Sequence, residues 1–360
     1  MNATQRLHSL GQSLWLDNIT RTMLDDGTLE RLIAQDSITG LTSNPSIFAA
    51  AIDAGDAYDQ DIKAKSAAGG SVESVFVEIA LDDLRRAADL FRPVFDATAQ
   101  LDGWVSMEVS PLLAADTGGS IAAAQEIFGL AQRENLFVKI PGTPQGLAAI
   151  EESIISGIPI NVTLLFSRDQ YLAAANAYIR GIERRVEAGR DPRVTSVASL
   201  FVSRWDVAAN PQLPVDLQTR LGIAVAQQTY RAYRELLTSA RWRKLAALGA
   251  RPQRLLWAST GTKDPGVVDT FYVDALAAPD TVNTIPEKTL LAVADHGRVG
   301  SVMAADGVAA AAAMAQLAGA GVDETVLAAQ LQLEGVASFE ASWHELMARI
   351  AAKRAVVGVP

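Results

Sequence analysis

The sequence of 360 residues contains no cysteine and only three histidines. Without cysteine the chain can form no disulfide, no thiolate metal site and no cysteine nucleophile. His8, His296 and His344 are far apart in the sequence, and no pair of them has the spacing of metal ligands. The sequence therefore predicts no metal site.

Positive charge is also scarce, since 31 Lys and Arg residues stand against 41 Asp and Glu residues. The net charge of −10 argues against a surface for nucleic acid or for an anionic membrane. Residues 1–10 contain no apolar core of signal-peptide length, and no apolar run approaches the length of a membrane helix. We therefore expect a cytoplasmic protein whose partners are small molecules, with a local group of cations if its substrate is phosphorylated.

Short apolar segments alternate with longer segments of helical periodicity along most of the chain. The short segments predict eight strands, at residues 13–17, 37–42, 103–110, 135–141, 158–165, 193–201, 254–259 and 280–284. The longer segments predict helices at residues 19–34, 72–95, 118–135, 142–156, 169–188 and 217–248. Another helix is expected after Pro45, with Ser46 as its cap. The tail, residues 300–355, is rich in alanine and leucine and predicts two or three helices.

This order of elements predicts an α/β fold, a (β/α)8 TIM barrel with additional C-terminal helices. A doubly wound sheet is the second choice, because the turn after the first strand lacks the glycine pattern of a dinucleotide-binding fold. No repeat or linker divides the chain, so residues 1–360 are expected to form a single domain. Within it, residues 300–360 would be a helical extension packed on the barrel, either over its mouth or at a subunit contact.

Polar side chains recur in or just past the C-terminal half of the predicted strands. In a barrel of this type those strand ends face one common pocket, whereas the opposite ends mostly serve stability. Any one of these residues could belong to a turn, but seven consecutive strands each supply one. We therefore expect a shared pocket built from Asp17, Asn44, Glu108, Lys139, Asn161, Ser199 and Ser259.

Lys139 lies in the middle of the apolar strand at residues 135–141. Burying an ammonium group costs several kcal/mol unless the group is paired or loses its proton. The neutral amine is a nucleophile that forms Schiff bases with carbonyl substrates. The alternative is that Lys139 extends its charge past the strand end into water. The other polar residues at the strand ends favour the nucleophile.

Several separate motifs resemble those of the transaldolase family, over roughly residues 10 to 290. The matching segments follow the order of the family: Gly40–Ser46 (GLTSNPS), Ser106 with Glu108 and Val109, Val138–Pro141 (VKIP), Asn161–Ser167 (NVTLLFS), Ser199 with Phe201 and Arg204, and Trp257–Thr260 (WAST). The resemblance is to the longer bacterial branch of that family. It implies a (β/α)8 enzyme of the pentose phosphate pathway that uses a Schiff base and no cofactor. Such enzymes move a dihydroxyacetone unit from a ketose phosphate to an aldose phosphate.

The resemblance also implies the catalytic roles of four residues. Lys139 would attack the C2 ketone of sedoheptulose 7-phosphate or fructose 6-phosphate, and the resulting iminium would serve as an electron sink. Glu108, acting through a water held by Thr163, would deliver a proton to the departing hydroxyl. Asp17 would take the proton of the C4 hydroxyl as the C3–C4 bond breaks. Two carboxylates beside a lysine favour its charged form, so we expect them to be offset from the amine or bridged by water.

The remaining positions are expected to bind the substrate. Asn44 and Asn161 suit the hydroxyls of the dihydroxyacetone unit, because an amide donates and accepts without carrying charge. Phe201 is expected to line the pocket and to keep water away. Arg204 is expected to bind the phosphate, whereas Gly261 stands where the best-known branch has an arginine, so that Lys263 would supply the second charge. The other expected contacts are Thr42, Ser106, Ser199 and Ser259. For Thr42, Ser106 and Ser199, capping of the next helix is an equal alternative.

Two other functions stay open from the sequence. A Schiff-base aldolase that releases free dihydroxyacetone would use the same lysine, aspartate and phosphate site. A non-catalytic barrel that binds sugar phosphates is expected to lack Lys139, Asp17 or Glu108, and all three are present. The sequence does not choose between a monomer and a homodimer, nor does it identify the acceptor.

Overall fold

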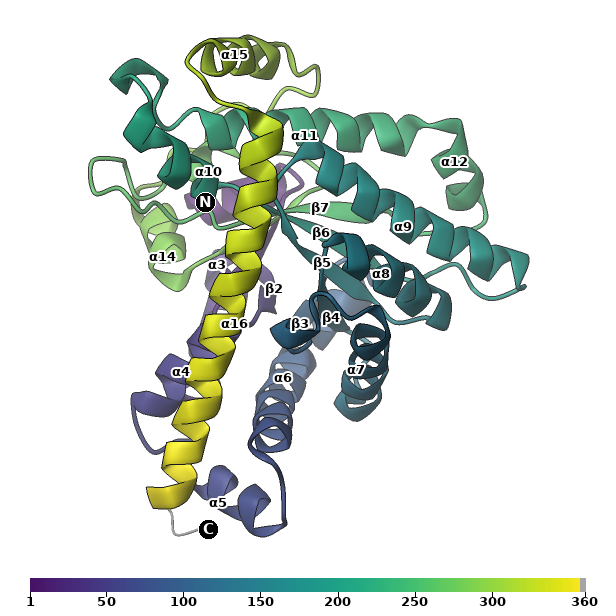
Figure 1. Ribbon diagram of the computed structural model, residues 1–360, viewed down its shortest axis with the longest axis vertical. Coiled ribbons are helices and arrows are strands. Elements are labelled where there is room, and N and C mark those ends of the chain that lie inside the picture. The colour runs from purple at the N-terminus through teal and green to yellow at the C-terminus, as the bar shows by residue number, and fades with distance from the viewer. Residues whose placement is uncertain (357–360) are drawn as a thin grey trace.

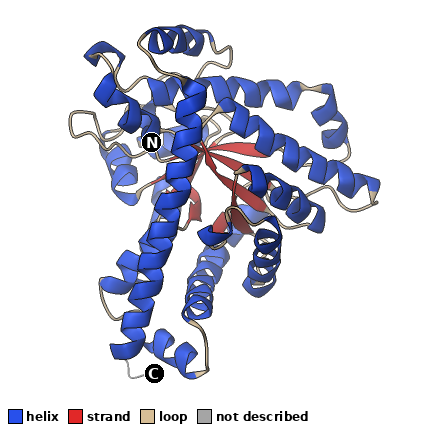
Figure 2. Ribbon diagram, viewed as in Figure 1, coloured by secondary structure: helices blue, strands red, loops and turns tan. Residues whose placement is uncertain are grey.

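Eight parallel strands close into a barrel in chain order, from β1 to β8 and back to β1. The structure is a computed structural model that describes residues 1–356, so residues 357–360 of the predicted domain lie outside it. Figure 2 shows the strands at the centre with helices around them. The predicted (β/α)8 barrel is confirmed, with strands β1 (Ser13–Asp17), β2 (Ile38–Thr42), β3 (Trp104–Glu108), β4 (Leu136–Pro141), β5 (Ile160–Leu165), β6 (Ser196–Phe201), β7 (Gln253–Ala258) and β8 (Val282–Ile285).

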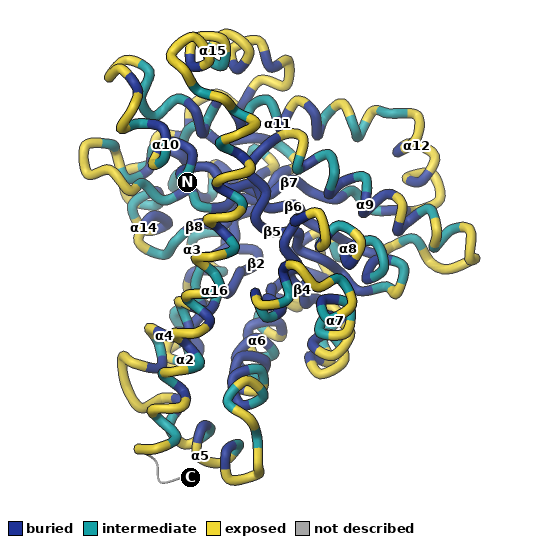
Figure 3. The backbone as a smooth tube through the Cα atoms, viewed as in Figure 1, coloured by how far each residue is buried: buried dark blue, intermediate teal, exposed yellow. Residues whose placement is uncertain are grey.

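The strands are buried on both faces, because the helices cover the outside and side chains fill the inside. Every residue of β2 to β8 is buried, which explains why these segments read as nearly continuous apolar runs. Figure 3 shows the buried backbone at the barrel and the exposed backbone on the outer helices. The polar residues within these strands therefore stand out against an apolar background.

Helices follow the strands as expected, with two corrections to the predicted boundaries. The predicted helix at residues 19–34 is two helices, α2 (Arg21–Asp25) and α3 (Thr28–Asp36), because Gly27 takes a left-handed conformation with φ of 72° between them. The predicted helix at residues 217–248 is also two, α11 (Leu221–Thr238) and α12 (Ala240–Ala247). Ser239 is extended at the break, and its hydroxyl accepts a hydrogen bond from the backbone of Trp242 to begin α12.

The first half of the molecule carries helices α1 (Ala3–Ser9), α2 (Arg21–Asp25), α3 (Thr28–Asp36), α4 (Pro45–Asp53), α5 (Asp59–Ala67), α6 (Val72–Ala97), α7 (Thr117–Ala131) and α8 (Pro144–Ser156). The second half carries α9 (Arg168–Glu187), α10 (Ser203–Ala209), α11 (Leu221–Thr238), α12 (Ala240–Ala247), α13 (Phe271–Ala275), α14 (Glu287–His296), α15 (Val308–Gly319) and α16 (Glu324–Val356). Short 3₁₀ turns are η1 (Pro111–Leu113), η2 (Asn210–Gln212) and η3 (Val215–Leu217). No helix of the described residues is long and apolar enough to span a membrane.

Aromatic rings fill the barrel interior beneath the expected pocket. Phe137 lies two residues before Lys139, so both side chains point into the barrel. Trp104 stacks on the Phe137 ring with centroids 4.1 Å apart, and Trp15 packs against the same ring at 6.0 Å. These rings close the barrel below the lysine, which leaves access only from the carboxyl ends of the strands.

The C-terminal helix α16 crosses the molecule as one long rod, drawn in yellow in Figure 1. It packs against α4, α5, α6 and η1 and contacts β5. Its buried side includes Leu331, Gly335, Trp343, Leu346 and Ile350. The helix therefore lies on the side of the barrel that carries β5 and α4.

Candidate active site

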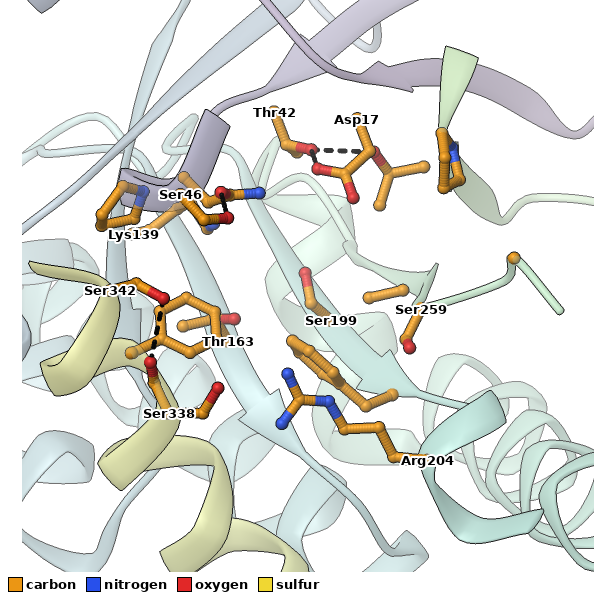
Figure 4. Close-up of a pocket in the computed structure, with 18 of the residues that line it drawn as sticks. Asp17, Thr42, Ser46, Lys139, Thr163, Ser199, Arg204, Ser259, Ser338 and Ser342 are labelled. Atoms are coloured by element: carbon orange, nitrogen blue, oxygen red, sulfur yellow. Dashed lines mark hydrogen bonds between the residues drawn. The ribbon is translucent and has the colours of Figure 1, made fainter. Parts of the chain in front are cut away.

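A cavity of about 260 Å³ opens at the carboxyl ends of the strands (Figure 4). Eleven of the thirteen residues predicted for the site line it: Asp17, Thr42, Asn44, Lys139, Asn161, Thr163, Ser199, Phe201, Arg204, Ser259 and Lys263. The other two predicted residues, Glu108 and Ser106, are buried behind its wall. The strand-end pattern in the sequence thus converges on one cavity.

Lys139 is shielded from solvent inside this cavity, with 7% of its surface exposed. Its Nζ donates a hydrogen bond of 3.1 Å to the backbone carbonyl of Ser43 and lies 3.4 Å from Oε2 of Glu108. Parallel register explains the pairing, because Glu108 on β3 stands beside Lys139 on β4. The amine is therefore held between one carbonyl and one carboxylate, away from bulk water.

Glu108 reaches Lys139 from behind the main cavity. It lines a separate hollow of about 10 Å³ with Ser43, Phe76 and Trp343. That volume is close to the space that one water molecule needs. Burial raises the pKa of Glu108, and the neighbouring charge of Lys139 lowers it by less. Glu108 therefore keeps its proton to a higher pH than a free glutamate does.

Asp17 lies at the end of β1 and is held by Thr42, which is itself hydrogen-bonded to Thr284. The Thr42 hydroxyl donates to Oδ1 of Asp17 at 3.0 Å and lies 2.8 Å from the hydroxyl of Thr284 on β8. Burial raises the pKa of Asp17, while the charges of Lys139 and Lys263 and the hydrogen bond from Thr42 act in the opposite direction. The carboxyl group is thus held in one orientation by Thr42, and its pKa lies above that of a free aspartate because burial is the largest of these effects.

Asn161 is fixed by hydroxyl groups on both neighbouring sides. The Ser199 hydroxyl donates to Oδ1 of Asn161 at 2.7 Å, and Nδ2 of Asn161 donates to Oγ of Ser106 at 3.2 Å. Ser106 thus supports the site through Asn161 rather than lining the cavity. The prediction that Asn161 lies in or past the C-terminal half of its strand is wrong, because Asn161 is the second residue of β5. It still joins the site because the register places it beside Lys139 on β4.

Asn44 caps the helix α4, which corrects the expectation that Ser46 does so. Oδ1 of Asn44 accepts from the backbone amide of Ile47 at 3.1 Å and from the Ser46 hydroxyl at 2.7 Å. Its cap position has extended backbone, as an N-cap requires. Both residues line the cavity, so the cap points the Asn44 amide toward it.

Two cations lie on the far side of the cavity from Lys139. Arg204 is partly buried, with its guanidinium 5.5 Å from the centre of the Phe201 ring, and burial lowers its pKa. Lys263 is exposed at the rim. Within residues 1–356 neither side chain forms an ion pair. Between them, Ser259 takes a left-handed backbone with φ of 56°, and its hydroxyl lies 2.9 Å from that of Ser203.

Sequence reasoning missed one whole wall of the cavity, which α16 supplies. Ser338, Phe339 and Ser342 line the cavity, and the Phe339 ring centre is 5.9 Å from Nζ of Lys139. Figure 4 shows the two serines on α16 beside Thr163, across from Ser259. Their spacing along the helix places them on one face. That spacing was the only signal, and it does not say what the face contacts.

A (β/α)8 barrel with a polar cavity at the carboxyl ends of its strands has the arrangement of a barrel enzyme. Residues 14–350 match the family model described as Transaldolase/Fructose-6-phosphate aldolase. The chain therefore belongs to the transaldolase/fructose-6-phosphate aldolase family and is an enzyme of that family.

Curated relatives align over nearly the whole chain. A transaldolase of Thermobifida fusca (strain YX) is 46% identical over 356 residues, covering 96% of this chain and 97% of the relative. A transaldolase of Thiobacillus denitrificans is 43% identical, covering 97% of this chain and 100% of the relative. A transaldolase of Mycolicibacterium smegmatis is 43% identical, covering 95% of this chain and 94% of the relative. The resemblance found in the sequence motifs is confirmed.

Proposed function

We propose that this enzyme transfers a dihydroxyacetone unit from a ketose phosphate to an aldose phosphate through a Schiff base on Lys139. The donors are sedoheptulose 7-phosphate and fructose 6-phosphate, and the acceptors are glyceraldehyde 3-phosphate and erythrose 4-phosphate. The observation that carries the proposal is the buried amine of Lys139. Its Nζ lies 3.4 Å from the carboxyl group of Glu108, and the cavity that Lys139 lines is also lined by Asp17. Relatives that are 43–46% identical over nearly the whole chain are named transaldolases.

Imine formation is the first step. The neutral amine of Lys139 adds to the C2 ketone, and the carbinolamine then loses water to give the iminium. Loss of water needs a proton at the departing hydroxyl. Glu108 is suited to supply it, because burial raises its pKa and its Oε2 is close to Nζ. A water bound near Thr163 would carry the proton on the cavity side.

Cleavage of the C3–C4 bond is the second step. Asp17 accepts the proton of the C4 hydroxyl, the aldose leaves, and the electron pair of the broken bond moves into the iminium to form an enamine. When the acceptor aldehyde arrives, C3 of the enamine attacks its carbonyl carbon and Asp17 returns the proton to its oxygen. Hydrogen bonding by Thr42 keeps Asp17 in one orientation through both halves of the reaction.

Substrate binding divides between amides near the lysine and cations at the rim. Asn44 and Asn161, the latter held by Ser199, would bind the hydroxyls of the three-carbon unit. Arg204 and Lys263 would bind the phosphate, since neither forms an ion pair within the described chain. Thr42, Ser106, Ser259 and Phe201 complete the set, of which Ser106 acts through Asn161.

The second candidate is an aldolase that releases dihydroxyacetone to water. The openness of the rim favours it, because Lys263 and Ser338 are exposed to solvent. The depth of Lys139 favours transfer, because an enamine formed there is shielded from the water that would protonate it. We propose transfer as the main activity. We also propose that residues 300–360 act as part of the barrel domain, since α16 forms a wall of the cavity.

One experiment tests the reaction and the lysine together. The protein is mixed with fructose 6-phosphate, with and without erythrose 4-phosphate, and sedoheptulose 7-phosphate is measured. Borohydride added to the donor mixture should fix a three-carbon adduct on Lys139, which peptide mass spectrometry locates. Labelling of another lysine would refute the assignment of Lys139. Absence of sedoheptulose 7-phosphate, with dihydroxyacetone released instead, would support the aldolase.

A further inference from the structure

We propose that Phe339 on α16 decides whether the three-carbon unit is transferred to an aldehyde or lost to water. The proposal rests on the function proposed above and goes beyond it, because it assigns reaction specificity to a residue outside the barrel. Phe339 lines the cavity, and its ring centre lies 5.9 Å from Nζ of Lys139. The apolar ring thus lies on the cavity side near the nitrogen on which the enamine forms.

The position of Phe339 is fixed by contacts that begin two turns before it along α16. Nε2 of Gln332 donates to the backbone carbonyl of Leu164 at 2.9 Å and to that of Gly142 at 3.1 Å. Gly142 follows β4 directly. Leu164 lies in β5 and has a left-handed φ of 58° at a break in the strand register. The hydrogen bonds therefore tie α16 to the strands on either side of the site.

Close packing on both sides of Phe339 holds the same face of the helix. Gly335, four residues earlier, is so near β5 that a Cβ added there would lie 2.9 Å from Cδ2 of Leu164. Trp343, four residues later, is buried, and its ring packs edge-on against Phe76 at 5.4 Å. Residues spaced by four lie on one helix face, so Phe339 stands between two packed neighbours. These contacts fix the helix backbone that carries Phe339 beside the cavity.

The chemistry explains why cover at this point matters. Release of the enamine consumes one water: its oxygen becomes the C2 ketone oxygen, one proton goes to C3, the other goes to the amine of Lys139, and the C2–N bond breaks. Transfer instead forms a bond between C3 and the aldehyde carbon. Both reactions start from the same enamine, so their ratio depends on whether water or aldehyde reaches C3 first. An apolar ring over the amine slows the approach of water.

The test compares Phe339→Ala with Phe339→Leu, which keeps most of the apolar volume. Free dihydroxyacetone and sedoheptulose 7-phosphate are measured with fructose 6-phosphate and erythrose 4-phosphate in D₂O, with deuterium at C3 of the released product as a second readout. Phe339→Ala should raise the ratio of release to transfer roughly tenfold, whereas Phe339→Leu should change it about twofold or less. Leu333→Ala, at an exposed position of the same helix, should leave the ratio unchanged.

Several outcomes would overturn the proposal. An unchanged ratio in a folded Phe339→Ala protein would do so, with folding checked by the melting temperature. An equal rise in the alanine and leucine variants would overturn exclusion of water by apolar volume as the cause, because the leucine side chain keeps most of that volume. Failure of the proposed function looks different, since wild-type protein would then form neither a borohydride adduct on Lys139 nor a transfer product.

Discussion

Glu108 and Lys139 stand beside each other on β3 and β4, with Oε2 and Nζ 3.4 Å apart and both side chains buried. The carboxyl group faces a hollow the size of one water, whereas the amine faces the main cavity. The proposed proton donor, Glu108, and the proposed nucleophile, Lys139, are therefore in contact although they face different cavities. Asp17 approaches the same cavity from β1, so the two acids do not share one position.

The buried Glu108 and the partly buried Asp17 predict a bell-shaped pH profile. Asp17 must be ionised to act as a base, and burial raises its pKa, so activity should fall as the pH drops through that raised value. Glu108 must be protonated to act as an acid, and burial raises its pKa, so imine formation should slow as the pH rises through it. Glu108→Gln should lower the rate of imine formation roughly 100-fold and remove the alkaline limb. Stopped-flow trapping across pH measures both.

The control for that profile is Glu134→Gln, since Glu134 is exposed and lies before the start of β4, at the opposite end of the barrel from the cavity. It should leave both limbs in place. An alkaline limb that persists in Glu108→Gln would remove Glu108 from the protonation step.

Asp17→Ala should separate imine formation from carbon–carbon cleavage. The variant keeps Lys139 and Glu108, so borohydride should still trap an adduct, now with the uncleaved ketose phosphate. Cleavage should slow by about two to three orders of magnitude, because a positioned general base is lost. Mass spectrometry of the trapped peptide and rapid-quench measurement of erythrose 4-phosphate report the two steps. Wild-type turnover in this variant would exclude Asp17 from the mechanism.

Arg204→Ala should weaken binding of phosphorylated substrates. A charge-assisted hydrogen bond contributes about 1.5–3 kcal/mol, so KM for fructose 6-phosphate should rise roughly 10- to 150-fold while kcat changes less. Lys263→Ala should have a smaller effect, since Lys263 is exposed at the rim. Steady-state kinetics with fructose 6-phosphate and with unphosphorylated fructose give the contrast.

The loss in Arg204→Ala should be confined to the phosphorylated donor. Lys244→Ala, on the exposed surface of α12, serves as the charge-matched control and should behave as wild type. An equal loss with fructose and fructose 6-phosphate would mean that Arg204 supports the fold of the cavity and not the phosphate.

Gly335→Val should loosen α16 over the cavity. A branched side chain would meet Leu164, where even a Cβ lies 2.9 Å from Cδ2, so the helix must shift. The expected cost is about 1–3 kcal/mol in the free energy of unfolding, with more dihydroxyacetone released per transfer event. Chemical denaturation and the product ratio measure the two effects. Gly319→Val is the matched control, because nothing lies within 4 Å of a Cβ at that helical glycine.

The barrel and most of the cavity could be predicted because their signals are local. A polar residue at the end of an apolar strand is visible in the sequence, and closure of the barrel brings such ends together. Asp17, Lys139 and Ser199 were found in this way. Glu108 was also found, although it faces the smaller hollow and reaches the site only through its strand neighbour.

The features that could not be predicted depend on competing local options or on distant contacts. Asn44 and Ser46 are both good helix caps, and only the backbone geometry shows that Asn44 takes the role. The sequence left open whether the C-terminal helices cover the barrel mouth or form a subunit contact. It could not place the wall supplied by α16, because the position of that helix depends on Gln332, which binds carbonyls of Gly142 and Leu164. Those partners are 190 and 168 residues away along the chain.

In the sequence, the helix that lies beside the amine of Lys139 comes after the whole barrel. All eight strands precede α16, so during translation the barrel can close while Lys139 is still open to the surroundings. At that stage any small carbonyl metabolite could reach the amine. Docking of the final helix, held by Lys353 against Asp59 and the carbonyl of Gly55, then restricts entry to molecules that fit the finished pocket.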